Sequence, residues 1–209
     1  MTIVGDKCVL LRAHNKSKFN LVLDLDSTLI CSTLHIKTDQ IEYGCDTILC
    51  EFDHSSNKIY HVHQRKNLFD FLQEMGKYFN LYIYTMGTFD YAMNICLSIE
   101  TLLCTEIFSG IVSRYEFNNQ VQKYFYVVNE LESTNTIIID DNNNIWINDN
   151  KNNVIKINKY KYKKQDDYNN DNDLDILQNI LLEYVNLLTK ENLLETIEMI
   201  NALYQSFKA

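Results

Sequence analysis

The residues of this chain whose types and spacing most clearly suggest chemistry are two aspartates, Asp24 and Asp26, followed by Thr28. They come directly after the apolar run 21–23, which predicts a buried strand. Carboxylates at the carboxyl end of a strand lie where an open α/β sheet places its active site. The first can act as a nucleophile and metal ligand, and the second as an acid and base. This pattern therefore suggests phosphoryl transfer.

The elements that must position these carboxylates follow from the apolar patterns along the chain. Helical periodicity predicts helices at 67–78 and 89–103. Strands separated by such helices indicate an α/β fold with a mostly parallel central sheet flanked by helices. The strands are predicted, from short apolar or alternating runs, at 21–25, 81–84, 108–112, 136–139 and 153–157.

Two more of these strands end in side chains that could serve the same site. Thr85 follows the strand at 81–84, and Asp140 and Asp141 follow the strand at 136–139. The carboxyl ends of parallel strands meet at one edge of a sheet. We therefore expect these side chains to join the first pair of carboxylates, although they are far apart in the sequence.

Two regions extend this minimal sheet. The excursion at 32–63 contains two alternating segments, 47–52 and 58–62, joined by turn-forming residues. It predicts an inserted β-hairpin beside the site, a suitable place for substrate selection. The tail at 173–207 has the periodicity of an amphipathic helix, with a break near 189–192. We expect the tail to pack on the domain's own sheet, and a helix that binds a partner is the alternative.

Polar segments of low complexity lie at 142–153 and 166–173. Their Asn-rich and Asp-rich composition predicts surface loops. Trp146, within the first segment, is interpreted as a core aromatic outside the site.

Composition limits the class of protein further. The 209 residues suffice for one α/β domain, and a net charge of -9 argues against direct nucleic-acid binding. No apolar run approaches the roughly 18 residues of a membrane span, and the first six residues lack the features of a signal peptide. The six cysteines form no CxxC pair, so we expect reduced thiols in an intracellular protein without membrane contact.

The motifs occur in an order that resembles a known group of phosphatases. Residues 24–30 resemble the first motif of haloacid-dehalogenase-type phosphatases. Residues 84–92 resemble the second motif of a narrower branch, the RNA polymerase II C-terminal-domain phosphatases of the TFIIF-associating type. Arg114 and Lys123 resemble the third motif, and residues 137–146, with an Asp-Asp pair and a Trp, resemble the fourth.

The resemblance covers residues 18–165 and implies a Rossmann-like haloacid-dehalogenase fold with an inserted β-hairpin and a C-terminal helical tail. The implied activity is Mg²⁺-dependent dephosphorylation of serine or threonine in the heptad repeats of RNA polymerase II, through an aspartyl-phosphate. No region remains for the BRCT domain of larger relatives, so we expect residues 1–209 to form one catalytic domain. Departures from the family pattern include Phe89, where Arg is usual, and Asn67, where Pro is frequent.

The resemblance assigns the metal and proton chemistry to four aspartates. Asp24 is expected to be the nucleophile and to bind Mg²⁺. Asp26 is expected to protonate the leaving oxygen and then activate water, while its backbone carbonyl binds Mg²⁺. Asp140 and Asp141 are expected to complete or orient the metal shell.

The remaining assignments concern the phosphate and the substrate. Thr85 is expected to donate to phosphate oxygens, Lys123 to balance the developing charge, and Thr28 and Arg114 to bind substrate. Structural alternatives stay open at this stage. Thr85 could be a helix N-cap, Lys123 a solvated surface lysine, and Arg114 part of a structural ion pair, while Asp141 could cap a helix or loop.

The expected partners are the phosphorylated C-terminal repeats of RNA polymerase II, with general transcription factors as further candidates. Nuclear localisation follows from that substrate. Two alternatives keep the fold but change the function. One is the same chemistry on another phosphoprotein, and the other is an inactive module that binds phosphopeptides.

Overall fold

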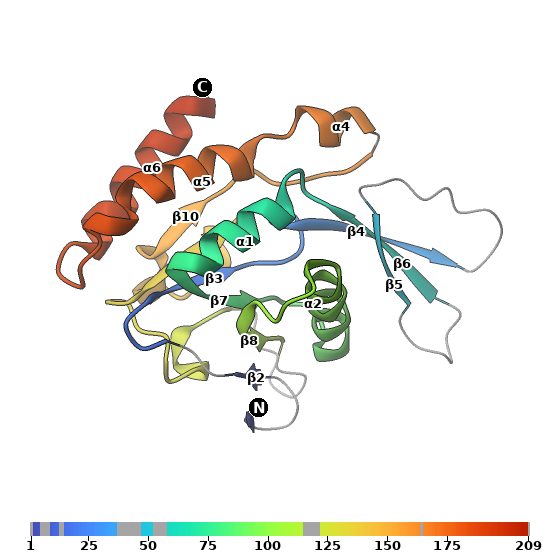
Figure 1. Cartoon of the computed structure of the whole chain (residues 1–209), viewed down its shortest axis with the longest axis horizontal. Coiled ribbons are helices and arrows are strands. Elements are labelled where there is room, and N and C mark those ends of the chain that lie inside the picture. The colour runs from blue at the N-terminus through green and yellow to red at the C-terminus, as the bar shows by residue number, and fades with distance from the viewer. Residues whose placement is uncertain are drawn as a thin grey trace.

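The computed structural model of the chain describes residues 2–4, 9–12, 15–36, 47–51, 58–114, 122–163 and 165–208. Figure 1 shows a central sheet with helices layered against it and a smaller sheet that extends to one side. None of the helices in these ranges combines the length and the apolar character needed to span a membrane.

The central sheet has the strand order β1-β2-β8-β7-β3-β9-β10. β3 pairs in parallel with β7 and β9, and β8 and β10 continue the parallel arrangement on either side. This confirms the predicted mostly parallel sheet. The strands are β1 (Thr2–Val4), β2 (Val9–Leu11), β3 (Phe19–Leu23), β7 (Phe79–Tyr84), β8 (Phe108–Val112), β9 (Thr136–Asp140) and β10 (Val154–Lys156).

The antiparallel edge formed by β1 and β2 was not predicted from the sequence. Each of these strands has only three residues, which is too short for a periodic signal. β2 is held instead by its pairing with β8, a contact between distant parts of the chain.

The smaller sheet has the order β4-β6-β5 and is antiparallel throughout. Its strands are β4 (Ile30–Ile36), β5 (Thr47–Glu51) and β6 (Lys58–Gln64). The two segments expected to form a hairpin pair as β5 and β6, and β4 is an additional strand. Residues 37–46 and 52–57 lie outside the described part of the chain.

The helices agree with the predicted long segments, and shorter ones occur where loops were expected. The prediction of surface loops at 142–153 and 166–173 was wrong in part, because α3 and α4 fall there. Both are short and polar, so apolar periodicity could not reveal them. The helices are α1 (Leu68–Tyr78), α2 (Phe89–Leu103), α3 (Asn148–Lys151), α4 (Gln165–Asn170), α5 (Asp173–Tyr184) and α6 (Leu193–Lys208).

The central sheet divides the core into two layers. Successive strand residues point to opposite faces, and one face, with Leu21 and Leu23 of β3, packs against α1, α2, α5 and α6. The other face, with Val22 and Ile138, packs against the irregular segment that carries Trp146. Because both faces are covered, β3 and β7 are mostly apolar rather than alternating, and a buried asparagine in each, Asn20 and Asn80, is the exception.

The tail is part of the main core. In α5 and α6, side chains such as Leu177, Ile180, Ile197 and Ile200 are buried in the same layer as α1 and α2. The chain between the two helices includes a short 3-10 turn at Val185–Leu187, near the expected break.

We predict that Leu177→Ala lowers the free energy of unfolding by about 2–5 kcal/mol, because the substitution removes a fully buried side chain and leaves a cavity. Urea denaturation measures this change. Leu187→Ala is the matched control, because Leu187 is 61% exposed, and it should have little effect. Equal, small effects of the two substitutions would contradict a core role for the tail.

Candidate active site

The expected convergence of side chains occurs at the carboxyl edge of the central sheet. Asp24 follows β3, Thr85 follows β7, and Asp140 ends β9. The backbone amide of Asp24 donates to the carbonyl of Ile139 at 3.0 Å, which continues the pairing of the two strands into the site. The rigid sheet therefore sets the relative positions of these residues.

Lys123 provides the cation of the site. Its ammonium lies 2.6 Å from Oδ1 of Asp24 and 2.7 Å from Oδ2 of Asp140. The residue is 1% exposed, which excludes the alternative of a solvated surface lysine. Its backbone is held in place because its amide donates to Ile145 and its carbonyl accepts from Ile147.

Trp146 is both a core aromatic and a contact of the site. The residue is fully buried, and its indole Nε1 donates to Oδ2 of Asp140 at 2.9 Å. The Lys123 ammonium lies 5.5 Å from the centre of its ring. Its interpretation as a residue outside the site was therefore wrong, and its place shortly after the Asp-Asp pair was the sequence signal available.

Three carboxylates could hold a divalent cation. Asp24, Asp140 and Asp141 each offer an oxygen atom, and these atoms lie within 4.8 Å of one another. Carboxylate oxygens are the ligands that Mg²⁺ prefers, so the residues present fit such an ion. The side chain of Asp26 is not part of this group, and only its backbone carbonyl was expected to bind metal.

Thr28 is a buried residue that is hydrogen-bonded to the aspartates of the site. The residue is fully buried, and its hydroxyl donates to Oδ2 of Asp24 at 3.0 Å. The hydroxyl oxygen also accepts from the backbone amide of Asp141 at 3.1 Å. This placement favours a positioning role for Thr28 over the predicted contact with substrate.

Asp26 has a partner that the sequence analysis did not identify. The phenol of Tyr91, on α2, donates to Oδ1 of Asp26 and is also hydrogen-bonded to Ser32 on β4. The ring of Tyr60, on β6, meets Tyr91 edge to face with centroids 5.5 Å apart. Tyr91 therefore links Asp26 to the smaller sheet.

The loop after β7 places Thr85 and Arg114 at the same edge. Thr85 is buried, and its hydroxyl accepts from the amide of Gly87 at 3.0 Å. The N-cap of α2 is Thr88, so the alternative capping role for Thr85 is excluded. The amide of Arg114 donates to the carbonyl of Gly87 at 3.0 Å, and its side chain is exposed.

Burial sets the proton affinities of the site. Burial raises the pKa of Asp24 above its ordinary value, while Lys123 opposes this shift and Asp140 adds to it. Burial also raises the pKa of Asp26, against the hydrogen bond from Tyr91. For Lys123, burial alone would lower the pKa, but the two neighbouring carboxylates outweigh it and raise the pKa. Lys123 is therefore a persistent cation at neutral pH.

Comparison with known proteins identifies the family. The family model described as NLI interacting factor-like phosphatase matches residues 19–192. The chain belongs to this family. The assignment confirms the resemblance inferred from the motifs.

A curated relative supports the assignment. A phosphatase of the RNA polymerase II C-terminal domain from Schizosaccharomyces pombe is 25% identical over an alignment of 143 residues, and the match covers 62% of this chain and 20% of that protein. The chain therefore spans about a fifth of the length of this relative.

Two solved structures share the fold. A structure of Fcp1, described as an essential RNA polymerase II CTD phosphatase, has a TM-score of 0.63 at 18% identity and covers 85% of this chain and 64% of its own. A substituted fission yeast Fcp1 bound to beryllium fluoride has a TM-score of 0.56 at 20% identity and covers 91% of this chain and 62% of its own. These likenesses confirm the predicted fold class.

We predict that Lys123→Met lowers the free energy of unfolding at neutral pH by about 3–5 kcal/mol in metal-free buffer, because Asp24 and Asp140 then remain buried without their cation. Urea denaturation measures the loss. Lys190→Met, at an exposed position, is the matched control and should change stability little. A loss no larger than that of the control would show that the buried ion pairing contributes nothing to stability.

Proposed function

We propose that this chain is a protein serine/threonine phosphatase that works through an aspartyl-phosphate on Asp24. The observation that carries the proposal is the environment of this carboxylate at the end of β3. Lys123 and Thr28 hold it beside the carboxylate of Asp140. Membership in a phosphatase family supports the same class of reaction.

The proposed reaction has two displacements at phosphorus. In the first, an oxygen of Asp24 bonds to phosphorus while the bond to the serine or threonine oxygen breaks, and Asp26 gives that oxygen a proton. In the second, Asp26 takes a proton from water, whose oxygen bonds to phosphorus as the bond to Asp24 breaks. Inorganic phosphate leaves, and both aspartates return to their starting states.

The other side chains stabilise charge and hold geometry. The ammonium of Lys123 and the hydroxyl of Thr85 are proposed to receive the phosphoryl oxygens as negative charge builds on them. Arg114, exposed at the same edge, is proposed to orient the substrate. Mg²⁺, held by Asp24, Asp140, Asp141 and the backbone carbonyl of Asp26, would offset the charge of the phosphate group.

The proposed substrate is the phosphorylated C-terminal repeat region of RNA polymerase II. The S. pombe relative is named as a phosphatase of that domain, which supports this choice. We propose the smaller sheet as the surface that selects the peptide, because β4 and β6 contact Tyr91 beside Asp26. A disordered, extended substrate of this kind would depend mainly on local recognition of the phosphate.

Several wider features belong to the same proposal. Residues 1–209 would act as one catalytic domain, in the nucleus, where this substrate occurs. General transcription factors are proposed as further partners. Within this proposal, neither direct nucleic-acid binding nor membrane contact has a part.

We predict that Asp24→Asn lowers turnover by more than about a thousandfold, because an amide cannot form the acyl-phosphate. The assay measures phosphate release from heptad peptides that each carry one phosphoserine, with Mg²⁺ and with EDTA. Circular dichroism and thermal melting establish that the variant remains folded. Near-wild-type turnover by folded Asp24→Asn would overturn the mechanism.

The same assay separates the proposed substrate from its alternatives. Mg²⁺-dependent hydrolysis of p-nitrophenyl phosphate, with no release from any heptad peptide, would indicate that another phosphoprotein is the substrate. Peptide binding without turnover in either assay would indicate an inactive phosphopeptide-binding module.

We predict that Gly87→Ala lowers kcat by about tenfold or more, because small displacements of catalytic groups are costly. A Cβ at this position would lie 2.6 Å from Cδ1 of Tyr91, so the ring must shift, and we expect the shift to weaken the hydrogen bond between its hydroxyl and Asp26. The loss should be larger for a phosphoserine peptide than for p-nitrophenyl phosphate, whose leaving group needs no proton. Gly76→Ala, within α1, is the control and should retain wild-type kcat; equal losses for the two substrates would argue against an effect through Asp26.

A further inference from the structure

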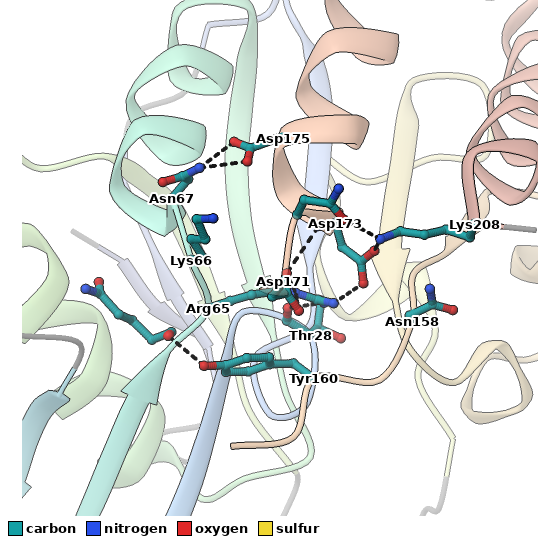
Figure 2. Close-up of polar contacts among 12 residues, drawn as sticks. Thr28, Arg65, Lys66, Asn67, Asn158, Tyr160, Asp171, Asp173, Asp175 and Lys208 are labelled. Carbon is teal, nitrogen blue, oxygen red and sulfur yellow. Dashed lines mark hydrogen bonds and ion pairs between the residues drawn. The ribbon is translucent and has the colours of Figure 1, made fainter. Parts of the chain in front are cut away.

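A buried arginine lies where β6 leads into α1 and joins distant parts of the chain (Figure 2). Arg65 is 1% exposed. Its Nε donates to both carboxylate oxygens of Asp171, at 2.9 and 3.0 Å, and its Nη2 donates to Asp173. A buried guanidinium requires such charged partners. These contacts attach the junction to the segment where α5 begins.

The opposite side of the same residue holds the loop of the first motif, residues 27–30. Nη1 of Arg65 donates to the carbonyl of Thr28 at 3.0 Å, and the backbone amide of Arg65 donates to the carbonyl of Leu29 at 2.8 Å. Arg65 therefore binds two successive carbonyls of the loop whose Thr28 hydroxyl lies between Asp24 and Asp141.

The far end of the network reaches the last helix. Asp173 also pairs with Lys208, at the end of α6, and the ammonium of Lys208 donates to Oδ1 of Asn172 at 2.7 Å. We call Arg65, Asp171, Asp173 and Lys208 the Arg65 cluster. Its two cations and two carboxylates balance, so it adds no net charge to the interior.

The two residues that follow Arg65 contact neighbouring parts of the same segment, and Figure 2 shows the contact of Asn67 with Asp175. The ammonium of Lys66 donates to the carbonyl of Asn169 at 3.0 Å, and Nδ2 of Asn67 lies 2.7 Å from each carboxylate oxygen of Asp175. Asn67 has a φ of 60°, in the left-handed region that Asn tolerates. Proline at this position could neither make this hydrogen bond nor adopt this φ.

Tyr160 ties the first-motif loop to β6 as well. Its backbone amide donates to the carbonyl of Ser27 at 2.7 Å, and its hydroxyl donates to the carbonyl of Gln64 at 2.9 Å. Ser27 has a φ of 68°, an uncommon conformation for a residue other than glycine. A turn of this kind persists only where the surrounding structure holds it.

We propose that Arg65 is a positioning residue, through which the C-terminal helices hold the first-motif loop so that Thr28 stays bound to Asp24 and Asp141. The predicted effect on turnover rests on the proposed phosphatase function. The predicted restraint of the first-motif loop is independent of that function. Catalytic groups must be held within a fraction of an ångström, and such a shell of supporting contacts provides that restraint.

The test compares variants of the Arg65 cluster with a variant that only weakens α5. Asp173→Asn keeps the shape of the side chain and removes its charge. Lys208→Met is a milder change that carries the test if Asp173→Asn does not fold, and Lys208→Arg retains the cation. Leu177→Ala destabilises the same helix without touching the cluster.

Two readouts are taken on each variant. Hydrogen exchange is followed at the amides of Ser27, Leu29 and Ile30, which all donate within the loop region, and at the amides of β3 as a reference. Hydrolysis of p-nitrophenyl phosphate with Mg²⁺ gives kcat and KM. The first readout is independent of activity, so it decides the role of the cluster even if the wild type proves inactive.

For Asp173→Asn we expect the loop amides to exchange about tenfold faster, with the β3 amides unchanged. We expect kcat to fall about tenfold while KM stays within about twofold. Lys208→Met should shift both readouts in the same direction by less, and Lys208→Arg should restore wild-type values. Leu177→Ala should leave the ratio of loop to β3 exchange unchanged.

Unchanged loop exchange in Asp173→Asn, or in Lys208→Met where Asp173→Asn is unfolded, would overturn the proposal. An equal change in Leu177→Ala would overturn it too, because the effect would then follow general stability. If the wild-type protein hydrolyses no phosphate ester, faster loop exchange in the variants would still support the restraint of the first-motif loop by the Arg65 cluster. The proposed phosphatase function would then be rejected. Faster loop exchange with undiminished kcat would overturn the positioning role.

Discussion

The structure depends on the burial of neighbouring carboxylates at strand ends against a single ammonium group. Asp24 and Asp140 repel each other and lose most of their hydration, an arrangement that is unfavourable without compensation. Lys123 bonds to both, and Trp146 donates a further hydrogen bond to Asp140. The parallel sheet brings the carboxylates together, whereas the compensating groups come from the irregular layer on one face.

Around this centre, hydrogen bonds restrain Asp24, Asp26 and the backbone of Asp141. Thr28 bonds to Asp24 and receives the amide of Asp141, and Tyr91 bonds to Asp26. Such restraint suits a reaction in which the side chains must already be in position when charge develops. These polar groups of the site have partners on strands, loops and a helix.

Two parts of the chain connect to the site, the smaller sheet and the C-terminal helices. The smaller sheet, proposed to select the substrate, contacts it through the hydrogen bond between Ser32 and Tyr91 beside the proposed acid and base, Asp26. The C-terminal helices connect to it through Arg65, which binds the carbonyl of Thr28, and the hydroxyl of Thr28 binds Asp24, the proposed nucleophile. Within one family, this arrangement allows the substrate-facing surface to vary while the rigid strand ends keep the chemistry.

The sequence by itself determined the fold class and the convergence of the carboxylates, because both follow from local signals. Periodicity placed α2 at Phe89–Leu103 and β8 at Phe108–Val112, and parallel strands necessarily end at one edge of their sheet. Only the tertiary structure decided the burial of Lys123, the bond from Trp146 to Asp140 and the place of Arg65. These contacts involve segments without regular secondary structure. Such segments have no periodic pattern in the sequence from which their contact partners could be deduced.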